Sequence, residues 1–327
     1  MRGSFTPPAL FLDFIKKYDK FILAGHEEPD ADCIGGTIAM ASLLRRLGKT
    51  ALLKSAGPFR KSETIPYKNL FSAEISEEEA DSAAAIIIDC SSPSRTGSLC
   101  EALKKLPLAI IDHHATASAE NGSVCAYIEP SSPSATILIF SLFKALPLKI
   151  TEEEARLLFL GICTDTGFFR HITSGNGDVF RIAAELIDAG ASPKETFAEI
   201  YGGKTLNSRL LLGTELCNTE SYFDGKLLIS CEELAETERY GIENRDSDTL
   251  YQLLTQIRGV EAIVVLRQST WNQCAIGFRS RDSIDVSKIA AVFGGGGHKN
   301  AAGAYIESKI ADLKQSILDE FKKILPE

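Results

Sequence analysis

The first half of the chain alternates short apolar runs with longer segments that carry apolar residues at helical spacing. Each run is bounded by turn or polar residues, which is typical of short strands buried on both faces. Amphipathic helices are predicted around the first runs at 8–17, 38–47 and 99–106. The predicted strands are 20–24, 50–54, 83–89, 108–111 and, at one edge, 124–128.

Strands and helices in alternation predict an α/β fold with a doubly wound, mostly parallel sheet, whose strand tips lie side by side. Further helices are predicted at 132–146, 151–163, 176–189 and 193–201. After a connecting helix at 204–217, strands return at 226–230, 262–266 and 273–278, which predicts a smaller C-terminal α/β domain. We therefore expect domains at 1–195 and 219–327, joined by a helical linker at 196–218.

The composition is that of an ordinary globular protein, since 44% of the 327 residues are hydrophobic and 24% are charged. The formal net charge of −9 argues against a broadly basic platform for long nucleic acids, but leaves open a small anionic substrate held by metals and a few arginines. No apolar stretch approaches the ~20 residues of a membrane helix, and the first residues lack the apolar segment of a signal peptide. We expect a cytoplasmic protein without membrane contact. The eight scattered cysteines lack zinc-finger spacing, and we expect them to stay reduced and structural.

Acids and imidazoles follow three of the predicted strands directly. Ligands of open α/β sheets collect at such carboxyl ends, and an acid at the tip of a buried strand is costly to bury unless it is paired or bound to a cation. The sequence therefore predicts convergence on a metal. Taken alone, the same residues also have ordinary explanations: Asp112 can cap a turn, the two adjacent histidines can lie on the surface, and the polar segment after the first strand can be a plain loop. The residues are His26, Asp30 and Asp32 after the first strand, Asp89 after the third, and Asp112, His113 and His114 after the fourth.

Two further features carry candidate chemistry. Asp165 lies in a predicted tight turn before Gly167, where an Asp caps its own backbone more often than it binds a metal. The glycines at 294–297 expose backbone N–H groups that can wrap an anion, although such runs are also common as plain turns. Arg279, at the end of a predicted strand, can meet a phosphate with two hydrogen bonds.

Together these motifs resemble the DHH phosphoesterase superfamily, which is named for the triplet at 112–114. The resemblance covers nearly the whole chain and implies a DHH domain followed by a DHH-associated domain. Six motifs in the family's order favour the metal hypothesis over turns and surface residues. They are HEEPDAD at 26–32, IIID at 86–89, DHH at 112–114, TDTG at 164–167, FRS at 278–280 and GGGGHKNAAG at 294–303.

The resemblance implies a hydrolase with two divalent ions, usually Mn²⁺, with Mg²⁺ or another divalent ion as the alternative. Two ions ~3.5 to 4 Å apart can hold a bridging hydroxide that attacks phosphorus. A site of oxygen and nitrogen ligands without a thiol suits Mn²⁺ or Mg²⁺ better than structural zinc. The implied catalytic residues are His114, facing the substrate, and Asp112, orienting an imidazole. By position, one ion takes His26, Asp30 and Asp89, and the other takes Asp32, Asp89, His113 and Asp165.

Within the superfamily the chain is most similar to the bifunctional nanoRNase/pAp phosphatases of the NrnA type. These act on very short oligonucleotides and on 3'-phosphoadenosine 5'-phosphate (pAp), and the resemblance implies a substrate in the cleft between the two domains and a homodimer. The acidic net charge fits a short substrate better than a long polymer or duplex. The residues that match the family's substrate-holding motifs are Arg279, Ser280, Gly295, Gly296, Gly297 and His298.

The first motif departs from the family pattern. Ala31 stands between the two acids, where Gly is common, and Glu27 and Glu28 precede Pro29. The ligand types survive, so we expect metal binding, with metal preference or tolerance of substrate charge altered by the extra acids.

Four alternative functions share parts of this pattern. A cyclic-dinucleotide or linear dinucleotide phosphodiesterase has both domains and stays open. A RecJ-like single-strand exonuclease is normally longer, and a family II inorganic pyrophosphatase lacks the GGGGH run. The alternative without catalysis is a nucleotide-binding regulator, and against it stands the fact that none of the six proposed metal ligands is replaced.

Overall fold

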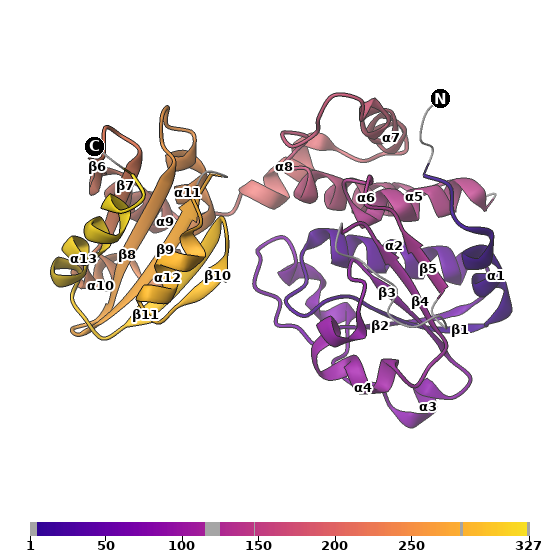
Figure 1. The fold of residues 1–327 in the computed structure, drawn as a ribbon. Helices are drawn as coiled ribbons and strands as arrows, with labels where there is room; N and C mark the ends of the chain where they lie inside the picture. Colours follow the sequence, from indigo (N-terminus) through magenta and orange to yellow (C-terminus); the bar gives the residue numbers. More distant parts are fainter. Residues whose placement is uncertain (1–4, 115–124, 147, 282–283, 326–327) are drawn as a thin grey trace. The chain divides into compact units, whose positions relative to one another are not determined.

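The chain folds into two compact units, Met1–Gly203 and Lys204–Glu327, each with its own sheet and hydrophobic core (Figure 1). This computed structural model describes residues 5–114, 125–146, 148–281 and 284–325. Within those ranges no helix has the length and apolar character needed to span a membrane. The domain limits expected from the sequence, at 195 and 219, stay a prediction.

The first unit is built on a five-stranded sheet in which all neighbouring strands are parallel, in the order β2-β1-β3-β4-β5. The predicted α/β class with a parallel sheet is thereby confirmed. The strand order reverses between β1 and β3, and sheets of this order bind ligands beyond the carboxyl ends of the strands at that point. The strands are β1 Lys20–Ala24, β2 Thr50–Lys54, β3 Ala84–Ile88, β4 Leu108–Asp112 and β5 Cys125–Ile128.

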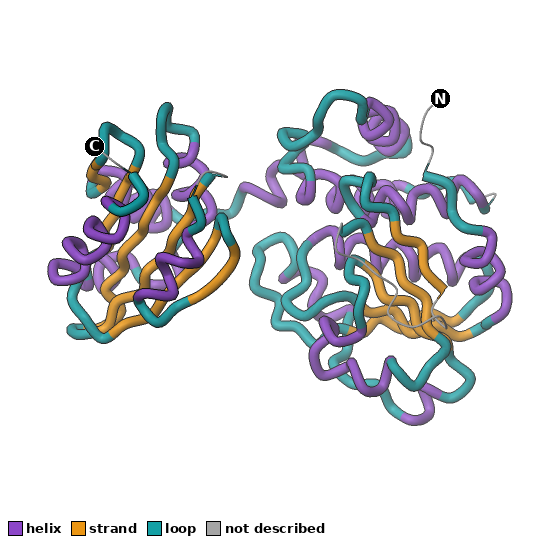
Figure 2. The backbone as a smooth tube through the Cα atoms, viewed as in Figure 1, coloured by secondary structure: helices purple, strands orange, loops and turns teal. Residues whose placement is uncertain are grey.

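Helices cover both faces of this sheet, with α2, α5 and α6 on one side and α3 and α4 on the other (Figures 1 and 2). Alternate residues of one strand therefore enter different cores: Leu23 packs with one set of helices and Ile22 with the other. Burial on both faces explains why the central strands are uninterrupted apolar runs. The helices are α1 Ala9–Lys17, α2 Ala31–Arg46, α3 Glu77–Ala80, α4 Cys100–Leu103, α5 Ala135–Ala145, α6 Glu152–Asp165, α7 Gly177–Asp188 and α8 Pro193–Tyr201, with 3-10 helices η1 Ile65–Leu70 and η2 Pro93–Leu99.

Two glycines let α6 pack closely against the start of α2. A Cβ atom at Gly35 would lie 2.6 Å from the Leu157 carbonyl oxygen, and one at Gly161 would lie 2.6 Å from Asp32 Oδ1. Neither contact is sterically tolerable, so each position needs glycine.

The last turn of α6 reaches Asp165, so the prediction of a tight turn at this residue is wrong. The backbone N–H groups of Thr166 and Gly167 still donate to the carbonyl groups of Ile162 and Thr164, which carries the helix through the acid. Gly167 follows two residues after the end of α6, and its φ of 55° is the left-handed conformation that glycine adopts at low cost.

The second unit is built on a six-stranded mixed sheet, in the order β10-β11-β9-β8-β7-β6, in which only β7 and β8 are parallel. Residues of α12 and α13 pack on one face, and residues of α9 and α11 pack on the other. The strands are β6 Thr219–Tyr222, β7 Leu227–Glu232, β8 Ala262–Thr270, β9 Gln273–Ser280, β10 Gly296–His298 and β11 Ala301–Ile306. The helices are α9 Leu206–Cys217, α10 Leu234–Tyr240, η3 Ile242–Asn244, α11 Ser247–Thr255, α12 Val286–Val292 and α13 Ile310–Lys322.

The glycine run forms structure where the sequence predicts an open anion-binding loop. The N–H groups of Gly294 and Gly295 donate to the carbonyl oxygens of Ala291 and Ala290 and so end α12. The rest of the run forms β10, which pairs with β11. A Cβ atom at Gly297 would lie 2.5 Å from the Ala301 carbonyl oxygen, so glycine here serves the close approach of two backbones.

Candidate metal centre

Four predicted ligands meet beyond the carboxyl ends of the parallel strands. His113 Nε2 lies 3.1 Å from Asp165 Oδ2, 3.3 Å from Asp89 Oδ1 and 3.9 Å from Asp32 Oδ2. All four ligand atoms lie within 4.8 Å of one another. The fold therefore brings together the whole set that the family resemblance assigns to one ion.

Asp89 lies between two imidazoles that come from different strands. Its Oδ2 is 3.4 Å from His26 Nε2, while its Oδ1 faces His113, so one carboxylate faces both halves of the site. The residue has a φ of 63°, which is uncommon outside glycine and turns the carboxylate away from the line of β3. Burial acts to raise the pKa of Asp89, which is 2% exposed, but His113 and His26 outweigh it and lower the pKa to about 2.

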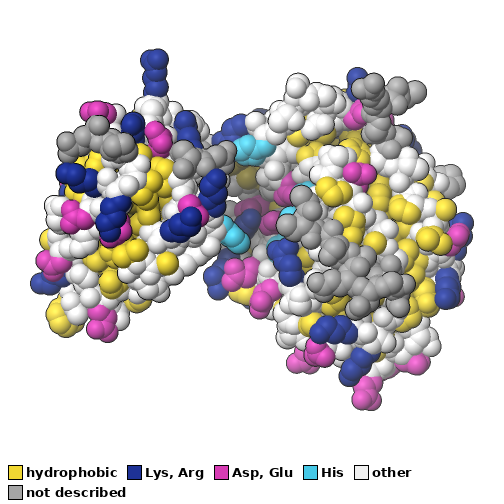
Figure 3. Space-filling model, viewed as in Figure 1, with side chains coloured by type: hydrophobic (Ala, Val, Ile, Leu, Met, Phe, Trp, Pro, Cys, Tyr) yellow, Lys and Arg dark blue, Asp and Glu magenta, His cyan; other side chains and the backbone are white. Residues whose placement is uncertain are grey.

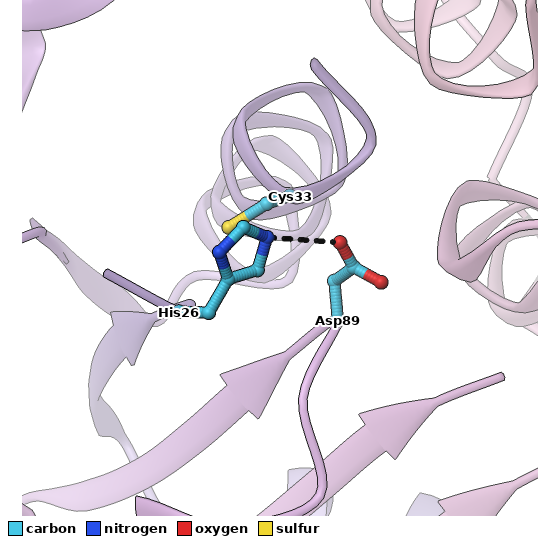
Figure 4. Close-up of side chains that lie close together, drawn as sticks. All are labelled: His26, Cys33 and Asp89. Carbon is cyan, nitrogen blue, oxygen red and sulfur yellow. Dashed lines mark ion pairs between the residues drawn. The ribbon is translucent and has the colours of Figure 1, made fainter. Parts of the chain in front are cut away.

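The His26 side of the centre differs from the prediction. His26 Nδ1 lies 2.8 Å from the Glu27 carbonyl oxygen, which leaves Nε2 toward Asp89. Asp30 Oδ1 lies 3.9 Å from that Nε2, yet it accepts hydrogen bonds from the N–H groups of Asp32 and Cys33 as the N-cap of α2. Among the described residues, the close ligand group on this side is His26, Cys33 and Asp89 (Figure 4).

The expectation of a thiol-free site is therefore wrong. Cys33 follows Asp32 in the first turn of α2, and that turn directs its sulfur toward His26 (Figure 4). Burial raises the pKa of the Cys33 thiol well above its usual value. The two extra acids of this motif are exposed and lie outside the ligand groups, and Glu28 forms a 3.0 Å ion pair with Arg60.

The N-terminus of α5 holds Asp32. The Ala135 and Thr136 N–H groups donate to its carboxylate at 2.6 and 3.0 Å, and the Thr136 hydroxyl donates at 2.6 Å. Burial, together with the charges of Asp165 and Asp89, raises the pKa of Asp32, which is fully buried, well above its ordinary value. Burial and neighbouring carboxylates also raise the pKa of Asp165 to about 6. Carboxylates crowded in this way ionise together only when a cation joins them.

The three residues of the DHH triplet make different contacts. His113 Nδ1 lies 3.2 Å from the Ser132 carbonyl oxygen, which turns Nε2 toward the carboxylates. Burial acts to lower the pKa of His113, but Asp165 and Asp89 outweigh it and raise the pKa to about 11. Asp112 Oδ1 lies 2.7 Å from His114 Nδ1 and also accepts from the N–H groups of both histidines, so it fixes the ring of His114. This contact raises the pKa of His114, whose side chain is 42% exposed.

The donor atoms fit a divalent cation. Asp89 Oδ1 and His113 Nε2 are buried and lie 3.3 Å apart, yet among the described residues neither has a hydrogen-bond partner of good geometry. Buried polar atoms are normally bonded, so two such atoms aimed at one space call for a ligand between them. Carboxylate oxygens with imidazole nitrogens suit Mn²⁺ or Mg²⁺, and His113 has the second hydrogen bond that metal-binding histidines usually make.

Three of the predicted substrate residues, Arg279, Gly296 and His298, share one face of the second unit's sheet. Arg279 on β9 pairs with Ala301 on β11, which pairs with His298 on β10, so Arg279 and His298 flank one small residue. The Arg279 guanidinium carbon lies 4.5 Å from the centre of the Tyr251 ring, and Nη1 donates to the Phe278 carbonyl oxygen at 2.9 Å. The Ser280 hydroxyl donates to the Ile284 carbonyl oxygen at 2.7 Å. Gly277, Gly303 and Gly296 form the next row across the same strands.

The sequence motifs do not point to three side chains that contact these residues. Cys33 directly follows Asp32, the last residue of the first motif, and this position is a usable signal. Thr136 is 104 positions from Asp32, and only the packing of α5 against α2 joins them. Tyr251 comes from α11, a helix outside every motif, so the sequence carries no local signal for its stacking on Arg279.

Comparisons with known proteins agree with this geometry. The DHH family, N-terminal domain, matches residues 20–162, and the DHHA1 domain matches residues 224–327. Over 295 residues the chain is 30% identical to the bifunctional oligoribonuclease and PAP phosphatase NrnA of Thermus thermophilus, which covers 90% of this chain and 86% of that protein. It is 26% identical over 327 residues to the cyclic-di-AMP phosphodiesterase PdeA of Listeria monocytogenes, covering 94% of this chain but 48% of that protein.

Solved structures share the fold at lower sequence identity. An exopolyphosphatase-related protein from Bacteroides fragilis has a TM-score of 0.79 at 22% identity, covering 97% of this chain and 96% of that one. Exonuclease RecJ bound to manganese has a TM-score of 0.53 at 16% identity, covering 99% and 97%. The ordered motifs, the converging ligands, the two matched domains and the Thermus thermophilus relative lead to one conclusion: the chain belongs to the DHH family of phosphoesterases, with an N-terminal DHH domain and a C-terminal DHHA1 domain.

Proposed function

We propose that this protein is a Mn²⁺-dependent phosphoesterase that hydrolyses very short oligonucleotides and pAp. The observation that carries the proposal is the group of Asp32, Asp89, His113 and Asp165, whose ligand atoms lie within 4.8 Å of one another at the carboxyl edge of a parallel sheet. The Thermus thermophilus relative, a bifunctional oligoribonuclease and PAP phosphatase, supports the substrate class.

The proposed metal ligands are those carried over from the family motifs. His26, Asp30 and Asp89 hold one ion, and a second ion is held by Asp32, Asp89, His113 and Asp165. When bound, such a pair supplies positive charge to the phosphate and lowers the pKa of the attacking water. Mn²⁺ is proposed because the donors are mostly oxygen and because the structurally similar exonuclease RecJ is bound to manganese.

His114 is the proposed catalytic side chain that meets the substrate. Asp112 accepts from His114 at Nδ1, so Nε2 is the atom left to face a phosphate oxygen. The contact with Asp112 also favours the protonated ring, since it raises the pKa of His114. The ring can therefore neutralise developing charge or donate a proton to the leaving oxygen.

In the second unit, Arg279 and His298 are proposed to hold a phosphate of the substrate. The Tyr251 ring and the Phe278 carbonyl oxygen hold the guanidinium in one orientation, which lowers the entropy lost on binding. Ser280 and residues 295–297 complete the proposed subsite, with the Ser280 hydroxyl held by the Ile284 carbonyl oxygen and the glycines offering backbone without side chains.

The charge pattern supports a short substrate. On the face that Figure 3 shows, and counting only described residues, Lys and Arg are scattered among Asp and Glu and form no broad basic patch. A protein that tracks a long single strand needs a continuous cationic groove.

The test is a time course with Mn²⁺ on five substrates: pAp, a 5'-phosphorylated dinucleotide, a long single-stranded oligonucleotide, cyclic di-AMP and pyrophosphate. We expect fastest turnover of pAp and the dinucleotide, with release of phosphate and mononucleotide respectively. Faster hydrolysis of cyclic di-AMP would favour the activity of the Listeria monocytogenes relative instead. Preference for the long strand or for pyrophosphate would refute the proposed substrate class, and binding without hydrolysis would indicate a regulator.

A further inference from the structure

A buried thiol lies in the metal centre. His26, Cys33 and Asp89 come from the loop after β1, the first turn of α2 and the tip of β3, and one ligand atom from each lies within 4.8 Å of the other two (Figure 4). Cys33 is 1% exposed, so its sulfur is held among these groups and not in solvent.

Local packing fixes the position of this sulfur. A Cβ atom at Gly25 would overlap Cys33 Sγ, so the thiol fills the space that a side chain beside His26 would otherwise take. The Cys33 backbone N–H donates to Asp30 Oδ1 at 3.1 Å, which fixes the start of α2 from which the sulfur projects. Asp30 Oδ1 therefore already accepts two hydrogen bonds as the cap of α2.

Sulfur, imidazole nitrogen and carboxylate oxygen together form a donor set for a thiophilic ion. Zn²⁺ takes Cys, His and carboxylate ligands in tetrahedral sites, and thiolate selects soft ions, whereas Mn²⁺ and Mg²⁺ prefer oxygen. We propose that Cys33 makes the His26 side of this centre a site for Zn²⁺ or Cd²⁺, held by His26 Nε2, Cys33 Sγ and Asp89, in competition with Mn²⁺. The thiol proton leaves to solvent as the metal–sulfur bond forms.

This inference rests on the metal centre of the proposed function and adds a form of regulation to it. A soft ion at this position takes His26 and Asp89, two of the three ligands proposed for one Mn²⁺, and so displaces that Mn²⁺ from the two-metal centre. The ratio of Zn²⁺ to Mn²⁺ then sets the fraction of protein able to turn over.

The test is a Cd²⁺ titration of the metal-free protein, followed through the ultraviolet charge-transfer band that a thiolate gives when it binds cadmium. Every thiol that binds Cd²⁺ contributes to this band. Excess Mn²⁺ is expected to displace Cd²⁺ from the metal centre but not from thiols elsewhere, so the relevant signal is the part of the band that excess Mn²⁺ removes. We expect C33A to lose this part and to bind Cd²⁺ at the centre at least about tenfold more weakly, in line with the loss of one ligand. C274A, which removes a buried thiol from the second unit, is the matched control and is expected to keep it.

Cys90 gives the sharpest counter-test, since it is buried and directly follows Asp89. Loss of the competed band in C90A with retention in C33A would overturn the assignment, as would an unchanged band in C33A. C33S keeps the size of the side chain and replaces the sulfur with a harder donor, so it gives the same answer if C33A does not fold. The band reports Cd²⁺ binding and does not depend on which substrate is hydrolysed. If the protein hydrolyses no substrate of the panel but shows the band, the proposed function fails and this inference stands. If it hydrolyses pAp but lacks the band, this inference fails and the proposed function stands.

Discussion

The buried aspartates of the metal centre and the buried glutamates of the second unit lie in opposite electrostatic settings. In the first unit Asp32, Asp89 and Asp112 are buried, and among the described residues their ion-pair partners are histidines alone. In the second unit Glu215 and Glu232 are fully buried and both contact Arg267, at 2.8 and 2.9 Å. Arg245 adds a further 2.8 Å ion pair to Glu232.

This difference distinguishes a structural ion-pair network, in the second unit, from a candidate metal centre, in the first. A guanidinium is charged at every physiological pH and its planar fork matches a carboxylate, so the second network is neutralised within the fold. The imidazoles of the first unit are weaker counter-charges. Among the described residues, three buried atoms of that centre have no hydrogen-bond partner, Asp89 Oδ1, Asp112 Oδ2 and His113 Nε2, whereas the second network has one such atom, Glu215 Oε2. Buried acids alone therefore do not indicate a metal centre, whereas buried acids without a permanent cation do.

Removing Asp89 gives the largest expected effect. D89A deletes the carboxylate that faces both His26 and His113, and we expect hydrolysis to fall by at least about 10³-fold, or about 4 kcal/mol of transition-state stabilisation. The measurement is Mn²⁺-dependent turnover of pAp, with D13A at an exposed position of α1 as the control. Activity near the wild-type level in D89A would remove the basis of the metal centre.

Removing Arg267 tests the other side of the comparison. R267M leaves Glu215 and part of Glu232 without their counter-charge, so we expect a loss of about 3 kcal/mol in the free energy of unfolding. Urea denaturation measures the loss, and hydrogen exchange in β7 and β8 locates it. Adding Mn²⁺ is expected to leave this loss unrepaired, and the triple variant R267M/E215L/E232L is expected to recover most of it. Unchanged stability in R267M would mean that the network contributes little.

A substitution at Thr136 tests whether the hydrogen bond that orients the ligand Asp32 affects metal affinity. T136V keeps the shape of the side chain but removes the hydroxyl that donates to Asp32 at 2.6 Å, and we expect Mn²⁺ affinity to fall about tenfold. T136S retains the donor and is expected to bind nearly as the wild type does. Isothermal titration calorimetry distinguishes the two, and equal affinities for both variants would show that the backbone N–H groups suffice.

The pKa values predict how Mn²⁺ stabilisation changes with pH. In the metal-free protein the pKa of His113 is raised from 6.5 to about 11, so its stabilising contribution is complete below pH 6.5 and is lost as the pH rises toward 11. The pKa of Asp165 is raised from 3.8 to about 6, so its contribution is lost between those values. Both shifts make the metal-free unit less stable as the pH increases.

Mn²⁺ competes with these protons, so its stabilising effect is expected to grow with pH. Between about pH 6 and 8, where His113 dominates, we expect the Mn²⁺-induced gain in stability to increase by about 1 kcal/mol per pH unit. Calorimetric melting with and without Mn²⁺ measures this gain. A gain that is flat or shrinks with pH would contradict the protonation state assigned to His113.

The sequence predicts the first unit well because its strands are buried on both faces. All five strands of the parallel sheet fall on predicted strands, and five of the acids and histidines that follow them lie in close ligand groups: His26, Asp32, Asp89, His113 and His114. The second unit is less predictable from pattern. The strand β6, with sequence TESY, is polar and lies at an edge, and β10 consists of two glycines and a histidine, so neither has the apolar alternation of a half-buried strand.

Within the metal centre, the residue types were predictable and the detailed contacts were not. The spacing of Asp30 and Asp32 allows either acid to cap α2, and only the fold shows that Asp30 does so. The left-handed backbone of Asp89 has no counterpart in the sequence pattern. The same holds for Cys33, because whether a helical side chain faces a core or a site depends on the neighbours that pack against it.

Gly161 has a consequence for how this protein can change over evolutionary time. A methyl group at this position would collide with Asp32. Gly161 therefore belongs both to the wall of the metal centre and to the packed interface of α2 and α6. Substitutions that change the packing of this interface are expected to move Asp32 as well. Mutations selected for thermal stability at the interface are therefore expected to change metal preference too. Lineages of this protein are therefore expected to drift freely at the outer helices and to remain nearly fixed at the interface of α2 and α6.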